Sequence, residues 1–186
     1  MAEQGFLQQA ANLQRDALRS VEAKLGPVNL ITLRTKSGYS RTLRCMGLFV
    51  EAERMSLQVL EQGKALSDTT GEFGTLFALY ELGNLYYDQE RWDEAEGMFE
   101  GAMEALIDLY GQDTPYALDV MYRLAYTQHE QRRYDDAVSM MTRCARSREL
   151  VLGAEHRDTQ KCWSTLKAWG QCTQSVSLEA RRQVKY

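Results

Sequence analysis

The sequence predicts an all-α fold, a right-handed superhelical solenoid of antiparallel helix pairs with a period of about 42 residues. Three observations support this prediction. The 186 residues contain only two prolines and many helix-forming residues, which favours helix along the whole chain. Apolar residues advance by threes and fours between polar turns. A small residue also recurs early in alternate segments, at intervals of 42, 43 and 42 positions: Ala10, Ala52, Ala95 and Ala137.

The stretch 81–106 shows the repeating unit most clearly. It predicts two amphipathic helices that meet at a polar turn, residues 88–91, with Trp92 at the joint. Gly83 and Ala95 are small, as is needed where two helices approach closely. One such pair cannot bury its apolar stripe alone, so we expect stacked neighbouring pairs to bury it.

Further markers repeat in step with the alanines. Three positions before them stand Leu7, Phe49, Trp92 and Tyr134. Seven positions after them stand Ala17, Val59, Ala102 and Cys144. Independent markers that share one period indicate a repeat protein.

These markers place the helices along the chain. A lone second helix is expected near 5–24, followed by complete pairs near 29–66, 73–109 and 115–151. A further first helix near 157–172 carries Trp163 and Trp169, and Ser177–Tyr186 is a candidate second helix to cover them. We expect a single repeat domain over 1–186, with a half repeat at 5–24, repeats at about 25–66, 67–109 and 110–151, and a partial repeat at 152–186.

Local signals define several helix ends. Thr114 suits an N-cap and Pro115 suits the first helical position. Gly26, Gly111 and Gly153 suit turns that end helices.

The composition excludes several classes of protein. The chain is 44% hydrophobic and 26% charged, with a net charge of -4 from mixed signs, which predicts neither nucleic acid nor a membrane surface as partner. No apolar run reaches the roughly 20 residues of a membrane span, and the first residues do not resemble a secretory signal, so a cytoplasmic location is expected. The four cysteines lack metal-binding spacing and are expected to be reduced, without a disulfide framework.

The markers resemble tetratricopeptide repeats, specifically the 42-residue variety of kinesin light chains, which also occurs in fungal NLR-like proteins. The family turn is similar to LGPVNLITL at 25–33, YGQDTPYAL at 110–118 and LGAEHRDTQ at 152–160, and the family joint to ERWDEA at 90–95 and RRYDDA at 132–137. The resemblance covers roughly 5–172. Where the family has a groove asparagine, this chain has Gly38, Glu81, Arg123 and Thr165.

The resemblance implies a concave groove lined by the first helix of each pair. Helical steps then predict a site for a protein or peptide partner, because tyrosine and arginine are typical interface anchors. The predicted site residues are Arg34, Arg41, Phe77, Tyr80, Glu81, Asn84, Tyr87, Asp88, Asp119, Tyr122, Arg123, Tyr126 and Glu130. The alternative interpretation makes the tyrosines half-buried spacers and the charges a solvated face.

No catalytic motif, cofactor site or metal spacing is recognised in the sequence. His156 lies where the family has a turn histidine, and His129 has no partner for general-base chemistry at helical spacing. The sequence therefore predicts a protein-binding scaffold rather than an enzyme. Two alternatives stay open: a homo-oligomer assembled through the terminal repeats, and an enzyme or small-ligand binder with a groove site around Glu81, Arg123 and His129.

Overall fold

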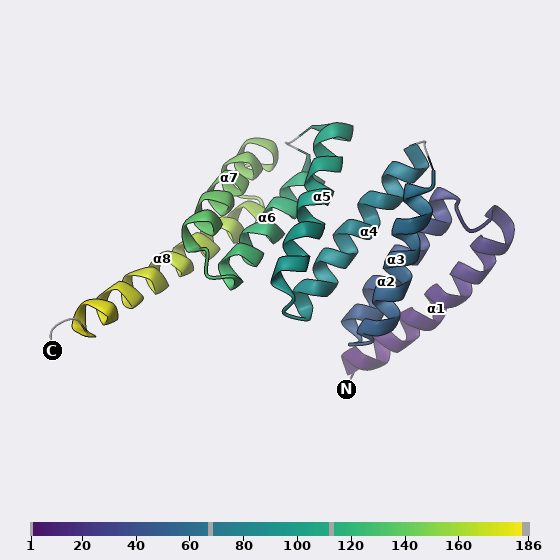
Figure 1. Ribbon diagram of the computed structural model, residues 1–186, viewed down its shortest axis with the longest axis horizontal. Helices are drawn as coiled ribbons and strands as arrows, with labels where there is room; N and C mark the ends of the chain where they lie inside the picture. The colour runs from purple at the N-terminus through teal and green to yellow at the C-terminus, as the bar shows by residue number, and fades with distance from the viewer. Residues whose placement is uncertain (1, 67–68, 112–113, 184–186) are drawn as a thin grey trace. The chain divides into compact units, whose positions relative to one another are not determined.

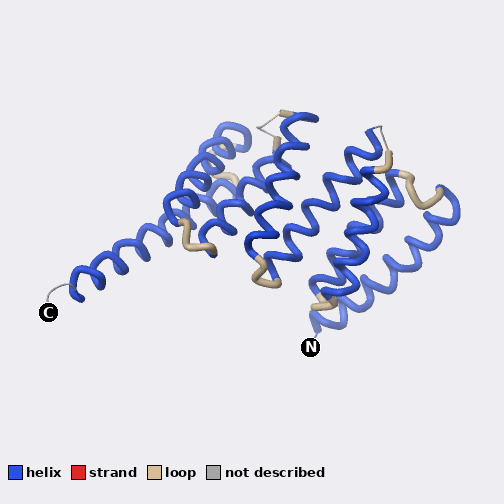
Figure 2. The backbone as a smooth tube through the Cα atoms, in the orientation of Figure 1, coloured by secondary structure: helices blue, strands red, loops and turns tan. Residues whose placement is uncertain are grey.

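The computed structural model describes the backbone of residues 2–66, 69–111 and 114–183 and the side chains of 5–66, 71–111 and 114–170 (Figure 1). Every regular element in these residues is a helix (Figure 2). The helices are α1 (Ala2–Leu25), α2 (Leu30–Cys45), α3 (Phe49–Lys64), α4 (Thr69–Asp88), α5 (Trp92–Tyr110), α6 (Pro115–Glu130), α7 (Tyr134–Leu152) and α8 (Arg157–Gln183). The predicted all-α class and the predicted helix pairs are confirmed.

The helices belong to two compact units, Met1–Leu109 and Tyr110–Tyr186. The division falls at the expected boundary between two repeats, where one helix pair ends and the next turn begins. The extent of a single domain over 1–186 stays a prediction.

In the first unit, α1 packs on α2, α2 on α3, and α4 on both α2 and α3. Leu33, Val59 and Ala78 form a fully buried apolar cluster contributed by α2, α3 and α4. The helix α5 approaches α4 closely at Gly83, where a Cβ atom would lie 2.6 Å from Cε1 of Phe99. Glycine is therefore required here because no larger residue leaves room for the phenylalanine ring.

In the second unit, α7 packs against both α6 and α8. The first helices of this unit also touch, since the Tyr126 hydroxyl on α6 lies 3.0 Å from Oγ1 of Thr165 on α8. Leu118 and Met141 are completely or almost completely buried in this unit.

The repeat markers occupy buried positions in α3, α5 and α7. The marker alanines of these three helices have no exposed surface, and the residues seven positions after them have none either. The six residues are Ala52, Val59, Ala95, Ala102, Ala137 and Cys144. The aromatic markers Phe49, Trp92 and Tyr134 are the first residues of the same three helices. The predicted period is thus the period of the packing.

The register of α1 differs from that of the other second helices. This helix buries Ala11 and Leu18, whereas Ala10 is half-buried and Ala17 is exposed. The repeat period aligns Ala10 and Ala17 with the buried marker residues, but neither of these two alanines is buried. The physical reason is that α3 packs on both α2 and α4, and α7 on both α6 and α8, whereas α1 packs mainly on α2 in the described residues.

Several helix ends follow the predicted signals. The Thr114 hydroxyl accepts a hydrogen bond of 3.2 Å from the Ala117 N–H, and Pro115 is the first residue of α6. Gly26, Gly111 and Gly153 have φ values of 84°, 84° and 92°, in the region that favours glycine.

The expected short second helix at the end of the chain is corrected by the structure. The backbone from Arg157 to Gln183 is one continuous helix, so residues 177–183 extend α8 and do not turn back over it. No proline or glycine follows Gly170 in this helix, so the sequence lacks a residue that would end it. Residues 184–186 lie outside the described residues.

Candidate functional site

The candidate site is the surface of the first helices, and each unit carries its own part of it. The part on α2 and α4 is called here the first-helix face of unit 1, and the part on α6 and α8 the first-helix face of unit 2. Unit 1 contributes Arg34, Arg41, Phe77, Tyr80, Glu81, Asn84, Tyr87 and Asp88, and unit 2 contributes Asp119, Tyr122, Arg123, Tyr126 and Glu130.

Two ion pairs join α2 to α4 on the face of unit 1. Nε and Nη2 of Arg41 lie 2.8 and 2.6 Å from Oε1 of Glu81. The hydrogen bond that Arg41 donates to Glu81 raises the pKa of Arg41 above its ordinary value. One turn further along α2, Nη1 of Arg44 contacts Oδ2 of Asp88. Because both pairs connect different repeats, they define how the two first helices lie beside each other.

Glu81 and Asn84 are almost fully buried, although the sequence predicts them in the groove. Their exposed fractions are 3% and 2%. Nδ2 of Asn84 donates a hydrogen bond of 2.8 Å to the Tyr80 carbonyl of its own helix. Glu81 Oε2 and Asn84 Oδ1 have no hydrogen-bond donor within reach in the described part of the chain. Both oxygens are therefore buried hydrogen-bond acceptors without a donor among the described residues, and such an acceptor lowers the stability of the fold.

Aromatic rings flank these polar groups in unit 1. Tyr80 meets Phe99 edge-on at 6.2 Å between ring centroids, and Tyr87 meets Trp92 in the same way at 5.0 Å. Phe77, Tyr80 and Tyr87 are half-buried, so each has a packed side and an exposed side. The packed sides agree with the interpretation of the tyrosines as half-buried spacers, and their role as contact residues for a partner stays a prediction.

A cluster of rings occupies the first-helix face of unit 2. The rings of Tyr122 and Tyr126 lie 4.8 Å apart, and Tyr126 meets Trp169 edge-on at 5.3 Å. His129 stacks on Trp169 at 4.4 Å with an angle of 11° between the rings. Burial raises the pKa of Tyr122, and its hydrogen bond with Tyr126 adds to this effect. Tyr126 and Arg123 keep part of their surface exposed, whereas Tyr122 is buried.

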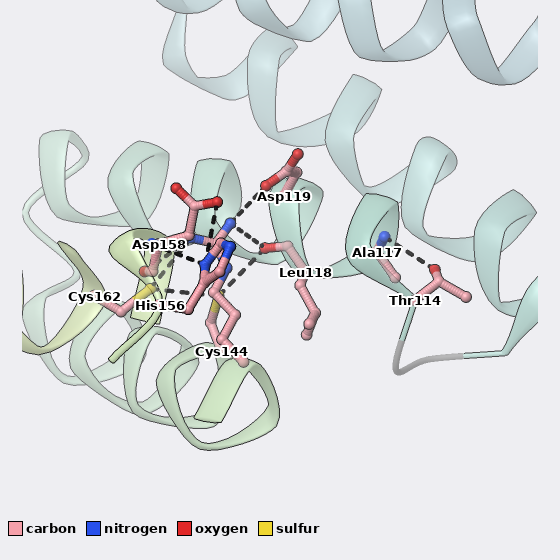
Figure 3. Close-up of polar contacts among 9 residues, drawn as sticks. Thr114, Ala117, Leu118, Asp119, Cys144, His156, Asp158 and Cys162 are labelled. Carbon is pink, nitrogen blue, oxygen red and sulfur yellow. Dashed lines mark hydrogen bonds and ion pairs between the residues drawn. The ribbon is translucent and has the colours of Figure 1, made fainter. Parts of the chain in front are cut away.

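Arg148 on α7 is an important residue of unit 2 that the sequence analysis does not single out. Only 3% of it is exposed. Its Nη2 atom lies 2.6 Å from Oδ1 of Asp119, and Nη1 donates to the Asp158 carbonyl at 3.2 Å. Figure 3 shows Leu118, Asp119, Asp158 and Cys162 gathered in one cluster. The available signal was a charged residue four positions after Cys144, on the stripe that the repeat markers bury.

The histidines and acids considered for catalysis have structural contacts. Glu81 is paired with Arg41 and His129 is stacked on Trp169. In the turn before α8, Nδ1 of His156 accepts a hydrogen bond of 3.2 Å from the Asp158 N–H. Over the described residues, no group of three or more His, Cys, Asp or Glu could hold a metal ion. Within the same residues, no helix has both the length and the apolar character needed to cross a membrane.

Comparison with known proteins relates this geometry to one repeat family. Residues 74–159 match the sequence pattern of the tetratricopeptide repeat. No curated protein sequence matches the chain. Among solved structures, BtubC (BKLC) from P. vanneervenii is similar with a TM-score of 0.76 at 14% identity, over 92% of this chain and 68% of that one.

Two further similar structures come from Podosopora anserina. A kinesin light chain-like protein with nearly identical TPR-like repeats has a TM-score of 0.71 at 19% identity, over 98% of this chain and 86% of that one. A variant of that protein has a TM-score of 0.66 at 18% identity, over 93% of this chain and 91% of that one. At these identities the likeness concerns the fold. The described residues therefore have the all-α repeat solenoid fold of kinesin light chain-like arrays, and residues 74–159 carry the tetratricopeptide repeat pattern.

Proposed function

We propose that this protein is a scaffold that binds a peptide or an extended segment of a partner protein on the first-helix faces of its repeats. The tetratricopeptide repeat fold supports a role in protein interaction in general. The finer proposal concerns the place of binding and the chemistry of the partner. It includes the cytoplasmic location expected from the sequence, and it involves no cofactor and no catalytic step.

The observation that carries the proposal is the combination of side chains on unit 1. Arg41, whose side chain is 58% exposed, pairs with Glu81 on α4, the helix that also carries the half-buried rings of Tyr80 and Tyr87. Aromatic and arginine side chains that are partly packed lose little conformational freedom when a partner covers them.

Unit 2 supports the same class of partner with different residues. Arg123 and Tyr126 are partly exposed, and Tyr126 is held by Thr165 and Trp169. Glu130 and Asp119 add exposed carboxylates. A partner segment with both charged and aromatic residues fits this mixture better than a uniformly acidic or basic one.

A peptide-library selection followed by affinity measurement tests this function. Selected peptides are expected to bind the wild-type chain and to lose at least tenfold in affinity with Arg123→Ala and Tyr126→Ala combined. The matched control is Leu150→Ala, because Leu150 is 87% exposed and lies on the second helix α7 of the same unit. Equal loss in the control, or binding that ignores both changes, would contradict the proposal.

A separate observation favours self-association as a second candidate function. Phe6 and Leu13, each 72% exposed, and Ala17 form an apolar stripe along α1. The corresponding side of α3, α5 and α7 is covered in this fold, as the buried markers show. At the other end, α8 is a first helix that presents Trp163 with 39% of its surface exposed. The first helix α8 of one copy can pack against the second helix α1 of another copy, as first and second helices do within an array. Such a head-to-tail contact can propagate from copy to copy.

Light scattering over a range of concentrations distinguishes this second candidate. A mass that rises with concentration in the wild type and returns to the monomer value with Phe6→Glu and Leu13→Glu combined would support it. Leu150→Glu serves as the control for an added surface charge. A monomer mass at all concentrations excludes this candidate and leaves the peptide-binding proposal unaffected.

A further inference from the structure

Two buried cysteines from different helices meet in unit 2. Sγ of Cys144 on α7 lies 3.9 Å from Sγ of Cys162 on α8, and the two residues are 18 positions apart in the sequence. Neither residue has any exposed surface. Figure 3 shows both sulfur atoms in the polar cluster that also contains Leu118 and Asp158. The repeat pattern assigns Cys144 to a packing position, but it does not explain why a second thiol faces it.

The surroundings of the two thiols are unequal. Nη1 of Arg148 lies 3.6 Å from Sγ of Cys162, whereas Sγ of Cys144 lies 3.3 Å from the Leu118 carbonyl oxygen. The hydrogen bond from Cys144 lowers the pKa of Cys162, and the positive charge of Arg148 acts in the same direction. The same hydrogen bond raises the pKa of Cys144, as does burial. Cys162 is therefore the thiol that ionises more readily, and Cys144 keeps its proton.

We propose that Cys144 and Cys162 form a reactive dithiol that a peroxide converts into a disulfide linking α7 to α8. The Cys162 thiolate attacks one peroxide oxygen, the O–O bond breaks, and hydroxide leaves and takes up a proton to become water. The resulting sulfenic acid is attacked by the Cys144 sulfur, which loses its proton as a second water leaves. Two thiols are oxidised and one peroxide is reduced to two waters.

The geometry permits this bond with a small movement. A disulfide requires a sulfur–sulfur distance of roughly 2.05 Å, so the two sulfurs must approach by about 2 Å. Both thiols are on helices of the same unit, and α8 carries exposed residues such as Trp163 on its other side. Both sulfurs are buried, so the peroxide reaches them through local opening of α8 from α7.

This requirement for opening distinguishes the pair from an ordinary exposed thiol. Cys45 is free and exposed at the end of α2. Alkylation of Cys45 is expected to be fast, whereas alkylation of Cys144 and Cys162 waits for α8 to open. The disulfide prevents α8 from separating from α7, so the oxidised chain unfolds at a higher temperature than the reduced chain.

The experiment treats the purified full chain with hydrogen peroxide, alkylates the remaining thiols under denaturing conditions and digests with trypsin. We expect an intact mass lower by two hydrogen atoms and a crosslink between the peptides 144–146 and 162–167, both removed by dithiothreitol. The Cys45→Ser variant is expected to form the same crosslink. Cys144→Ser and Cys162→Ser are each expected to lose it while keeping the helical circular dichroism of the wild type.

A second measurement keeps the proposal testable if a serine variant is poorly folded. The melting temperature of the oxidised wild-type chain should rise above that of the reduced chain and return after reduction. Three results would overturn the proposal: no crosslink after prolonged exposure, a crosslink that involves Cys45 instead, or sulfinic acid on Cys162 without a disulfide. The first result means that the sulfurs cannot approach, and the others mean that Cys144 is not the partner.

Discussion

Arg41 on α2 and Glu81 on α4 form an ion pair in which two nitrogens of the guanidinium contact a single carboxylate oxygen, at 2.8 and 2.6 Å. Glu81 is 3% exposed, whereas the side chain of Arg41 is 58% exposed. The buried carboxylate thus depends on a cation that reaches it from the surface. This pair connects two repeats at the candidate site and leads to the first prediction.

Arg41→Leu is expected to destabilise the first unit by about 1–3 kcal/mol, because Glu81 is left buried without its cation. Access of water to the exposed position of Arg41 keeps the loss below that of a fully buried pair. Urea unfolding followed by circular dichroism measures it. Adding Glu81→Gln should recover part of the stability, and Arg34→Leu on the same helix should change it by less than about 0.5 kcal/mol. Equal effects of Arg41→Leu and Arg34→Leu would show that the pair does not stabilise the fold.

Glu90 and Arg132 occupy the same place in the turns before α5 and α7, and both have positive φ values, 59° and 64°. In the turn before α3 this place is taken by Gly47, with a φ of 76°. Because a left-handed conformation costs a non-glycine residue roughly 1–2 kcal/mol, Glu90→Gly and Arg132→Gly are each expected to raise stability by about 0.5–1 kcal/mol. Thermal melts check this, and Gly47→Ala should lower the melting temperature. A decrease for both glycine variants would contradict the prediction.

Gly83 is expected to tolerate no side chain, because the added Cβ would lie 2.6 Å from the Phe99 ring. We predict that Gly83→Ala destabilises the first unit by about 1–3 kcal/mol through overpacking. Gly97 on α5 is the matched control, since a Cβ there meets no atom within 4 Å. Gly97→Ala should be neutral or stabilising because alanine favours helix. Identical denaturation midpoints for the two variants would refute the close approach of α4 and α5.

Ala95→Leu is expected to lower the melting temperature for a related reason. Ala95 has no exposed surface at the start of α5, so a leucine has to displace its neighbours at a cost of about 1–3 kcal/mol. Val50→Leu on α3 provides the control, because Val50 is 79% exposed. Differential scanning calorimetry compares the two. An unchanged melt for Ala95→Leu would show that this marker position is not tightly packed.

Arg148→Met is expected to loosen α8 from α6 and α7. The change removes the cation that contacts Asp119 and the donor to the Asp158 carbonyl, which precedes Cys162 on α8. A loss of about 2–4 kcal/mol is expected for removing a buried hydrogen-bonded charge. Hydrogen exchange of α8 amides measures the loosening directly. Arg146→Met, an exposed change on the same helix, should leave the exchange as it is. Slow exchange in both variants would assign Arg148 no role in docking α8.

The sequence predicted the helices well because their signals are local. Periodic apolar residues, the Thr114–Pro115 start and the helix-ending glycines act within one or two turns of chain, so no knowledge of distant contacts is needed. The repeat markers also predicted which residues are packed, because the second helices α3, α5 and α7 lie in equivalent environments. Where the environment differs, as for α1, the register inferred from the period was misleading.

The candidate site depended much more on tertiary structure. A helical stripe places Glu81 and Asn84 on the face of α4, but only the contact with α2 decides that Glu81 is buried beneath Arg41. The sequence marks Arg148 only as a charged residue on the buried stripe, and it does not show the partners Asp119, Asp158 and Cys162, which come from two other helices.

By itself, then, the sequence determined the helices, their pairing and the repeat pattern of residues 74–159. Each of these follows from short-range periodicity repeated along the chain. The tertiary structure decided which polar residues are buried, which cations accompany them and which two of the cysteines meet. The reason is that these contacts join residues whose separation, such as the 40 positions between Arg41 and Glu81, carries no periodic signal of its own.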